Sequence, residues 1–117
     1  MREIVVPTPE QMYDEAIGLQ QEGKLEEAVG RLHELLGQDP SYALAHAALS
    51  VFYGKLEKYD EAVEHGKKVC ELEPTDPFSF VALSLVCQKA GRVGEAEQAL
   101  MQARQAQMAA QQGEQPN

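Results

Sequence analysis

Apolar residues recur at helical spacing through the middle of the chain. Leu49 and Tyr53 are four positions apart, which places them on one face of a helix. Further along, a second stripe of apolar residues lies at helical spacing, as in a helix that turns one face to a core. Its members are Tyr59, Ala62, Val63, Val69, Cys70 and Leu72. The pattern predicts two consecutive helices, over residues 43–55 and 59–71.

The same arrangement occurs three times with a fixed period. Glu-Ala pairs stand thirty-four residues apart, at Glu27-Ala28, Glu61-Ala62 and Glu95-Ala96. A period of this length means that one small unit is built three times. We therefore expect copies at 9–42, 43–76 and 77–110, each made of two helices. The first helices are expected at 9–21, 43–55 and 77–89, and the second at 25–37, 59–71 and 93–111. The three repeated alanines are expected where the paired helices approach most closely.

Capping and turn residues support these boundaries. Thr8 and Pro9 offer an N-cap followed by a proline at the first helical position. Gly23 and Gly91 supply the left-handed residue that ends a helix and permits a tight turn. Glu57 replaces the glycine at the matching position of the middle copy.

Together these residues resemble the tetratricopeptide repeat. Its pattern has an apolar residue at position 4, Leu at 7, a small residue at 8, an aromatic at 11, Ala at 20, a large apolar residue at 24 and Pro at 32. The middle copy matches at Leu49, Ser50, Tyr53, Ala62 and Pro74, and the departures across the chain are Glu15, His46, Gly66 and Met108. The resemblance implies an all-α fold, a right-handed α-solenoid of three helix-turn-helix units with six helices. For function it implies only that the chain binds or organises proteins.

The third copy differs from the first two on the flank that would face a following repeat. The residues at repeat positions 21 and 28 are Val29 and Leu36, then Val63 and Cys70, then Glu97 and Arg104. The change to polar residues indicates the end of the array, and Met108 in place of proline lets the last helix extend. We expect an N-terminal arm over 1–8, one self-capped domain over 9–112 and a flexible tail over 113–117. A short coiled-coil seam in the Gln/Ala-rich end is the alternative.

In the tetratricopeptide family the first helices line a concave groove. Read onto this chain, its peptide-facing positions give an apolar strip with lysines at its edge: Tyr13, Ile17, Leu44, Val51, Lys55, Phe78, Val81, Leu85 and Lys89. One subfamily clamps a chaperone's terminal carboxylate with lysine, asparagine and arginine. The matching residues here are Tyr13, Ile17, Ala48, Phe78 and Ala82, none of which is cationic or carries an amide. The resemblance therefore points to an apolar or amphipathic peptide or helix rather than a carboxylate clamp.

Two other readings of the strip remain open. A tightly wound array of three repeats buries much of it, or the N-terminal Ile4-Val5-Val6 folds back into the groove. Alternatively the protein is a self-associating scaffold, a homo-oligomer whose groove holds a neighbour's N-terminal arm or last helix.

Charge and chemistry exclude most other classes. The net charge is -9, so the chain is a poor partner for nucleic acid. His33, His46 and His65 lie on different expected helices and form no metal-ligand pair, and no catalytic or cofactor motif is present, so we expect no enzyme and no metal or cofactor. Cys70 and Cys87 are expected to be buried thiols in a reducing compartment. Without a membrane span or a signal peptide, the expected location is cytoplasmic.

Overall fold

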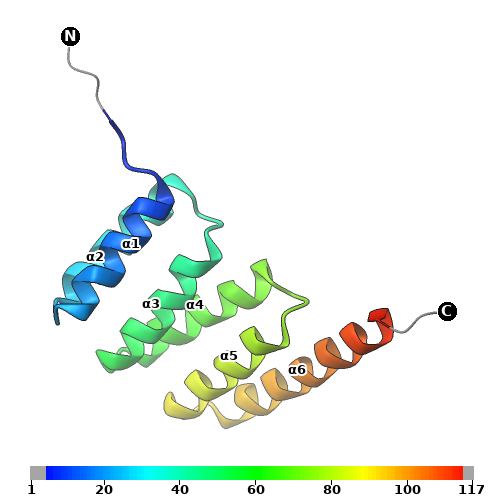
Figure 1. Ribbon diagram of the computed structural model, residues 1–117. Coiled ribbons are helices and arrows are strands. Elements are labelled where there is room, and N and C mark those ends of the chain that lie inside the picture. The colour runs from blue at the N-terminus through cyan, green and yellow to red at the C-terminus, as the bar shows by residue number, and fades with distance from the viewer. Residues whose placement is uncertain (1–4, 115–117) are drawn as a thin grey trace. The chain divides into compact units, whose positions relative to one another are not determined.

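The computed structural model describes residues 5–114, and the described residues form six α-helices (Figure 1). The helices are α1 (Pro9–Gln21), α2 (Leu25–Gln38), α3 (Ala43–Lys55), α4 (Tyr59–Leu72), α5 (Pro77–Lys89) and α6 (Val93–Glu114). The first five begin and end within one residue of the expected positions. The last continues three residues past its expected end and includes the start of the expected tail. The all-α fold of paired helices is confirmed.

Contacts between residues divide the chain into two compact units, Met1–Ala45 and His46–Asn117. The first unit contains the α1–α2 hairpin and the first turn of α3. The second contains the rest of α3 together with α4, α5 and α6. The division falls within a helix, one turn after the start of the second repeat.

In the first unit, the start of α1 is fixed by the expected cap. The Thr8 hydroxyl accepts from the backbone N–H of Gln11 at 3.2 Å, and the Gln11 side chain accepts from the N–H of Thr8 at 2.9 Å. This reciprocal capping box satisfies donors that a helix start otherwise leaves unpaired. Across the hairpin, Arg31 of α2 forms an ion pair with Glu15 of α1 at 2.9 Å. The buried residues of the hairpin include Met12, Ala16, Ala28 and Leu32.

In the second unit, one apolar cluster joins α4, α5 and α6. It consists of Val63, Cys70, Phe80, Leu83, Cys87, Ala96, Ala99 and Ala103. The start of α5 is capped by Asp76, whose carboxylate accepts from the N–H of Phe78 at 3.0 Å. Pro77 occupies the first helical position, where its missing N–H costs nothing.

The three turns between paired helices use the left-handed region. Gly23 has φ 83° and Gly91 has φ 78°, as expected for residues that end a helix. Glu57, at the same repeat position, has φ 61° although it is not a glycine. The repeated alanines Ala28 and Ala62 are fully buried, and the hydroxyl of Ser50 on α3 donates to the carbonyl of Ala62 on α4 at 2.8 Å. The first and second helices of a repeat therefore meet closely at this position.

Candidate functional site

A groove of about 380 Å³ lies in the second unit between α3 and α5, with α4 contributing to its wall. Four of the residues expected in a partner groove line it, namely Val51, Lys55, Leu85 and Lys89. In Figure 1 α3 and α5 run in the same direction, so equivalent residues of the two repeats lie at the same end of the groove. Because of the 34-residue period, α3 and α5 present residues from equivalent repeat positions to the groove.

Small residues open the space between the two helices. Ala47 and Gly54 on α3 and Ala82 on α5 line the groove, and Gly66 of α4 lies beneath it. A large side chain at any of these positions would occupy part of the volume that a partner could fill. The groove therefore depends on small residues at these positions as well as on its apolar side chains.

The walls of the groove are apolar and exposed. Val51 retains 53% of its surface and Leu85 retains 55%. Both helices also bury apolar residues that do not line the groove, such as Leu49 and Cys87. Apolar residues on an exposed face contribute nothing to the pairing of helices within a repeat, and contiguous apolar surface commonly marks a binding site.

Two lysines border the groove at one end. Lys55 lies in the last turn of α3 and Lys89 in the last turn of α5. Within residues 5–114 neither forms an ion pair, whereas Lys67 and Arg92 each pair with acidic neighbours. Lysine near a helix C-terminus is favoured by the helix dipole, so their positions cost little. The result is a positive edge on a chain whose net charge is -9.

The other expected groove residues are not among those that line this groove. Phe78 and Val81 lie on α5 and are exposed, but they do not line the groove. Tyr13, Ile17 and Leu44 belong to the first unit. Tyr13 is half-buried, with its ring centroid 6.2 Å from that of Tyr42. A single strip that runs through all three repeats stays a prediction.

Several lining residues were missed from the sequence. Ala47 and Gly54 stand at peptide-facing repeat positions, yet their small side chains gave no reason to select them. Val86 lies one residue after Leu85 on α5. Tyr59 and Val69 belong to α4, the second helix of its repeat. Only the rotation of α4 about its axis decides that they reach the groove, and a 34-residue period does not encode that angle.

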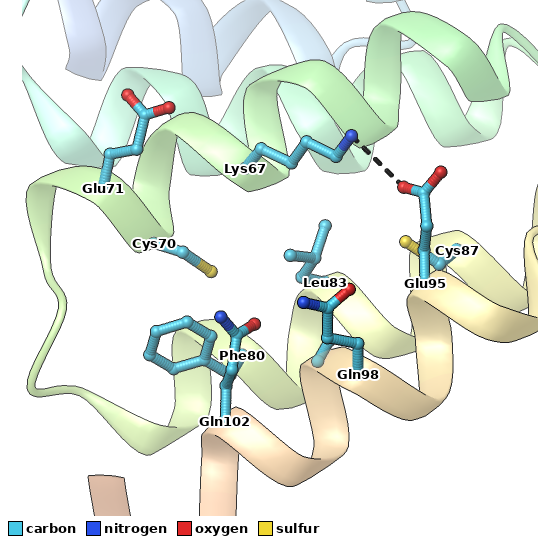
Figure 2. Close-up of a pocket in the computed structure, with 10 residues that line it drawn as sticks. Lys67, Cys70, Glu71, Phe80, Leu83, Cys87, Glu95, Gln98 and Gln102 are labelled. Carbon is cyan, nitrogen blue, oxygen red and sulfur yellow. Dashed lines mark ion pairs between the residues drawn. The ribbon is translucent and has the colours of Figure 1, made fainter. Parts of the chain in front are cut away.

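A second crevice of about 440 Å³ opens between α4 and α6, as Figure 2 shows. Its floor is made by Cys70, Phe80, Leu83 and Cys87. Lys67 of α4 reaches Glu95 of α6 at 3.2 Å across it, and this hydrogen bond lowers the pKa of Glu95. The charged residues at this crevice, Lys67, Glu71 and Glu95, are therefore already partnered within the chain.

The thiols of Cys70 and Cys87 on that floor are expected to be unreactive at neutral pH. Burial raises the pKa of the Cys70 thiol to about 11 and also raises the pKa of Cys87. Only a thiolate is an effective nucleophile or metal ligand, so both side chains act as small apolar residues at neutral pH. Among the described residues, no group of three His, Cys, Asp or Glu side chains could hold a metal ion. None of the described helices is long and apolar enough to cross a membrane.

Residues 43–76 match the sequence profile of the tetratricopeptide repeat family. The match has the boundaries expected for the middle copy, and six helices in three pairs are the architecture of such proteins. Residues 43–76 therefore form a tetratricopeptide repeat, and the paired helices of the described residues have the fold of tetratricopeptide repeat proteins. Repeats of this kind are protein-interaction modules and typically carry no catalytic site.

Solved structures share this fold. A crystal structure of MamA has a TM-score of 0.81 at 18% identity and covers 90% of this chain, which spans 61% of that protein's length. The second tetratricopeptide domain of Spaghetti (RPAP3), bound to the HSP90 peptide SRMEEVD, has a TM-score of 0.75 at 23% identity, covering 85% of this chain and 92% of its own. The type III secretion translocator chaperone SycD of Yersinia enterocolitica, in an alternative dimer, has a TM-score of 0.76 at 24% identity. The match covers 90% of this chain and 80% of SycD. No curated protein matches the chain.

Proposed function

We propose that the chain is a non-enzymatic interaction module that binds an apolar or amphipathic peptide or helix in the groove between α3 and α5. The observation that carries this proposal is an exposed apolar groove bordered by two lysines without ion pairs. The module would act as an adaptor or scaffold, because repeats present surfaces for a partner rather than enclosed reaction centres.

The groove suits the apolar face of a partner helix. Such a helix presents anchors at positions i, i+3 or i+4, and i+7, which fill successive spaces along a groove. Complete burial of a valine or leucine side chain is favourable by about 1.5–3 kcal/mol, and Val51 and Leu85 are each half exposed. Their remaining exposed surface therefore offers a partner a substantial part of that free energy. An acidic residue beside Lys55 and Lys89 would set the direction of the bound helix.

A terminal carboxylate is not the recognised feature in this proposal. Phe78 and Ala82 stand at two of the clamp positions, and Ala82 lines the groove without any hydrogen-bonding side chain. The RPAP3 domain is seen with the peptide SRMEEVD. We expect that peptide to give no saturable binding to this chain in calorimetry, whereas amidation of a true ligand's C-terminus should leave its affinity unchanged.

Substitution of the groove walls tests the site. Helical peptides would first be selected by display on the wild-type protein, and their affinities measured by fluorescence anisotropy. Val51→Glu and Leu85→Glu should each weaken binding at least about tenfold, because a bound apolar face would bury an unpaired carboxylate. Helicity and thermal melting should remain nearly unchanged.

The control is Gln105→Glu, which adds a carboxylate to the exposed surface of α6 and should bind as the wild type does. If Val51→Glu or Leu85→Glu unfolds the protein, the two side chains are core and the groove is not a docking site. Equal affinity in all variants would also refute the proposal.

The self-associating alternative places a neighbour's N-terminal arm in the groove. Val5 and Val6 are 81% and 63% exposed, so the described part of the arm offers apolar side chains that nothing covers; Ile4 lies outside the described residues. Deletion of residues 1–8 separates the two functions. A change of molecular mass in light scattering on deletion would favour the scaffold, and unchanged mass with unchanged peptide binding would favour the peptide groove.

A further inference from the structure

The exposed surface of α6 carries a stripe of apolar and charged residues. Going along the helix, its members are Val93, Glu97, Leu100, Met101, Arg104 and Met108. Successive members are three or four positions apart, except the adjacent pair Leu100 and Met101, so they share one face of the helix. Val93, Met101 and Met108 each retain more than half of their surface. The buried face of the same helix consists of alanines such as Ala99 and Ala103.

The stripe is symmetric about a point between Leu100 and Met101. Glu97 and Arg104 stand equally far from that point on either side, one acidic and one basic. Val93 and Met108 stand equally far from it farther out, and both are apolar. About this midpoint, each apolar residue of the stripe has an apolar residue at the equivalent distance on the other side, and the acidic Glu97 has the basic Arg104.

This order is what an antiparallel pair of identical helices requires. A two-fold axis through the midpoint sets each residue opposite its mirror position in the other copy. Glu97 then meets Arg104 of the partner subunit, and the same pair forms again on the other side of the axis. The apolar residues meet one another at the axis and at both ends. We propose that a second copy of this chain docks antiparallel on α6 through this stripe.

Charge complementarity selects this occupant over others. Within residues 5–114 neither Glu97 nor Arg104 forms an ion pair, so both remain available. A parallel arrangement would bring like charges together and is disfavoured. A partner that presented only acids or only bases would repel one of the two residues. A copy in the antiparallel orientation satisfies both at once.

The matching face of α4 shows that this side of a second helix can take part in packing. Val63 and Cys70 stand one repeat before Glu97 and Arg104, and both are buried in the cluster with Phe80 and Leu83. The third repeat keeps Leu100 and Met101 exposed beside its two charges. The α6 stripe therefore combines apolar contact area with charges that fix its register.

The interface is small. From Val93 to Met108 the stripe spans four turns, about 22 Å at the rise of an α-helix. A single helix pair of that length buries less than a standard interface, so the dimer should be weak, concentration-dependent and sensitive to salt.

Charge reversal tests the register by sedimentation equilibrium from low micromolar to millimolar protein. Glu97→Arg and Arg104→Glu should each reduce the association constant about tenfold, because two attractive pairs become two repulsive ones. The double variant with both changes should restore it, since each copy again offers one acid and one base. Gln102→Arg, on the same helix but on the face that lines the crevice, should leave association unchanged.

Cross-linking tests the axis. Met101→Cys should form a disulfide-linked dimer under mild oxidation, whereas Gln102→Cys should not, because Gln102 lines the crevice on another face of α6. The unsubstituted protein, whose two cysteines are buried, supplies the background. A monomer at every concentration would overturn the proposal. A dimer that persists in both single charge-reversal variants would also overturn it. If the dimer is instead lost in Val51→Glu, the contact between the two copies lies at the groove between α3 and α5 rather than at α6.

Discussion

The second and third repeats pack their first helix against the neighbouring helices in different ways. Thirty-four residues on from His46, Ser50 and Tyr53, the third repeat has Phe80, Ser84 and Cys87. The helices begin and end at equivalent positions in both repeats. The two interiors nevertheless differ, one polar and hydrogen-bonded and the other largely apolar.

In the second repeat each polar side chain at these positions has a partner on α4. His46 Nδ1 lies 3.0 Å from His65 Nδ1, a hydrogen bond in which one ring donates and the other accepts. The ring of His65 stacks on that of Tyr53 at 5.6 Å between centroids. The Ser50 hydroxyl donates to the Ala62 carbonyl. Directional bonds therefore hold α3 against α4, and α3 forms one wall of the groove.

In the third repeat the same contact is made by apolar packing. Phe80 and Cys87 belong to the cluster shared with α4 and α6. Ser84 is 1% exposed, and its hydroxyl has no hydrogen-bond partner among the described residues. A shared period thus fixes where helices lie, while the way in which buried polar groups are satisfied differs from one repeat to the next.

The largest expected effect comes from Gly66, which the third repeat replaces with Leu100. A Cβ at Gly66 would lie 3.2 Å from Leu83 Cδ1 and 3.4 Å from Ser50 Oγ. We expect Gly66→Leu to reduce the free energy of unfolding by about 2–3 kcal/mol, since overpacking outweighs the gain in helix propensity. Thermal melting should fall by about 10–20 °C.

Gly54→Leu is the matched control. A Cβ there meets nothing within 4 Å, so stability should hold or rise slightly while the larger side chain occupies the groove and weakens peptide binding. If Gly66→Leu melts as the wild type does, the contact between α4 and α5 is looser than the structure shows.

Much of this fold could be predicted from the sequence, because a 34-residue period and its capping residues act locally. Thr8, Gly23 and Gly91 have the roles that their positions indicate. The contact between His46 and His65 could not be predicted, because it depends on how two helices rotate toward each other. At 8% exposure His46 is buried.

The candidate site was predictable only in part, for a similar reason. Val51 and Leu85 follow from repeat positions that face outward in related proteins. Tyr59 and Val69 come from the second helix of the repeat, which the positional rule does not include. Sequence position predicts which residues a first helix presents, and packing decides which neighbouring helix completes the space.

The two serines give a smaller effect with opposite signs. Ser50→Ala removes a buried hydrogen bond and should destabilise the protein by about 1 kcal/mol. Ser84→Ala removes a buried hydroxyl without a partner, so stability should stay equal or rise by up to about 1 kcal/mol. Urea titration of both variants measures the difference directly. A loss of similar size at both positions would mean that Ser84 makes a hydrogen bond after all.

The smallest expected effect lies in the turns. Glu57 has φ 61°, a region that costs a side-chain-bearing residue about 1–2 kcal/mol relative to glycine, whereas Gly91 occupies the same turn of the third repeat without that cost. Glu57→Gly should therefore stabilise the second repeat by a few tenths to about 1 kcal/mol, because the greater freedom of glycine in the unfolded chain offsets part of the gain. The reverse change, Gly91→Glu, should destabilise the third repeat by about the same amount. Denaturant midpoints for the two single variants test this symmetry, and a loss of stability in Glu57→Gly would show that the Glu57 side chain has a role beyond the backbone turn.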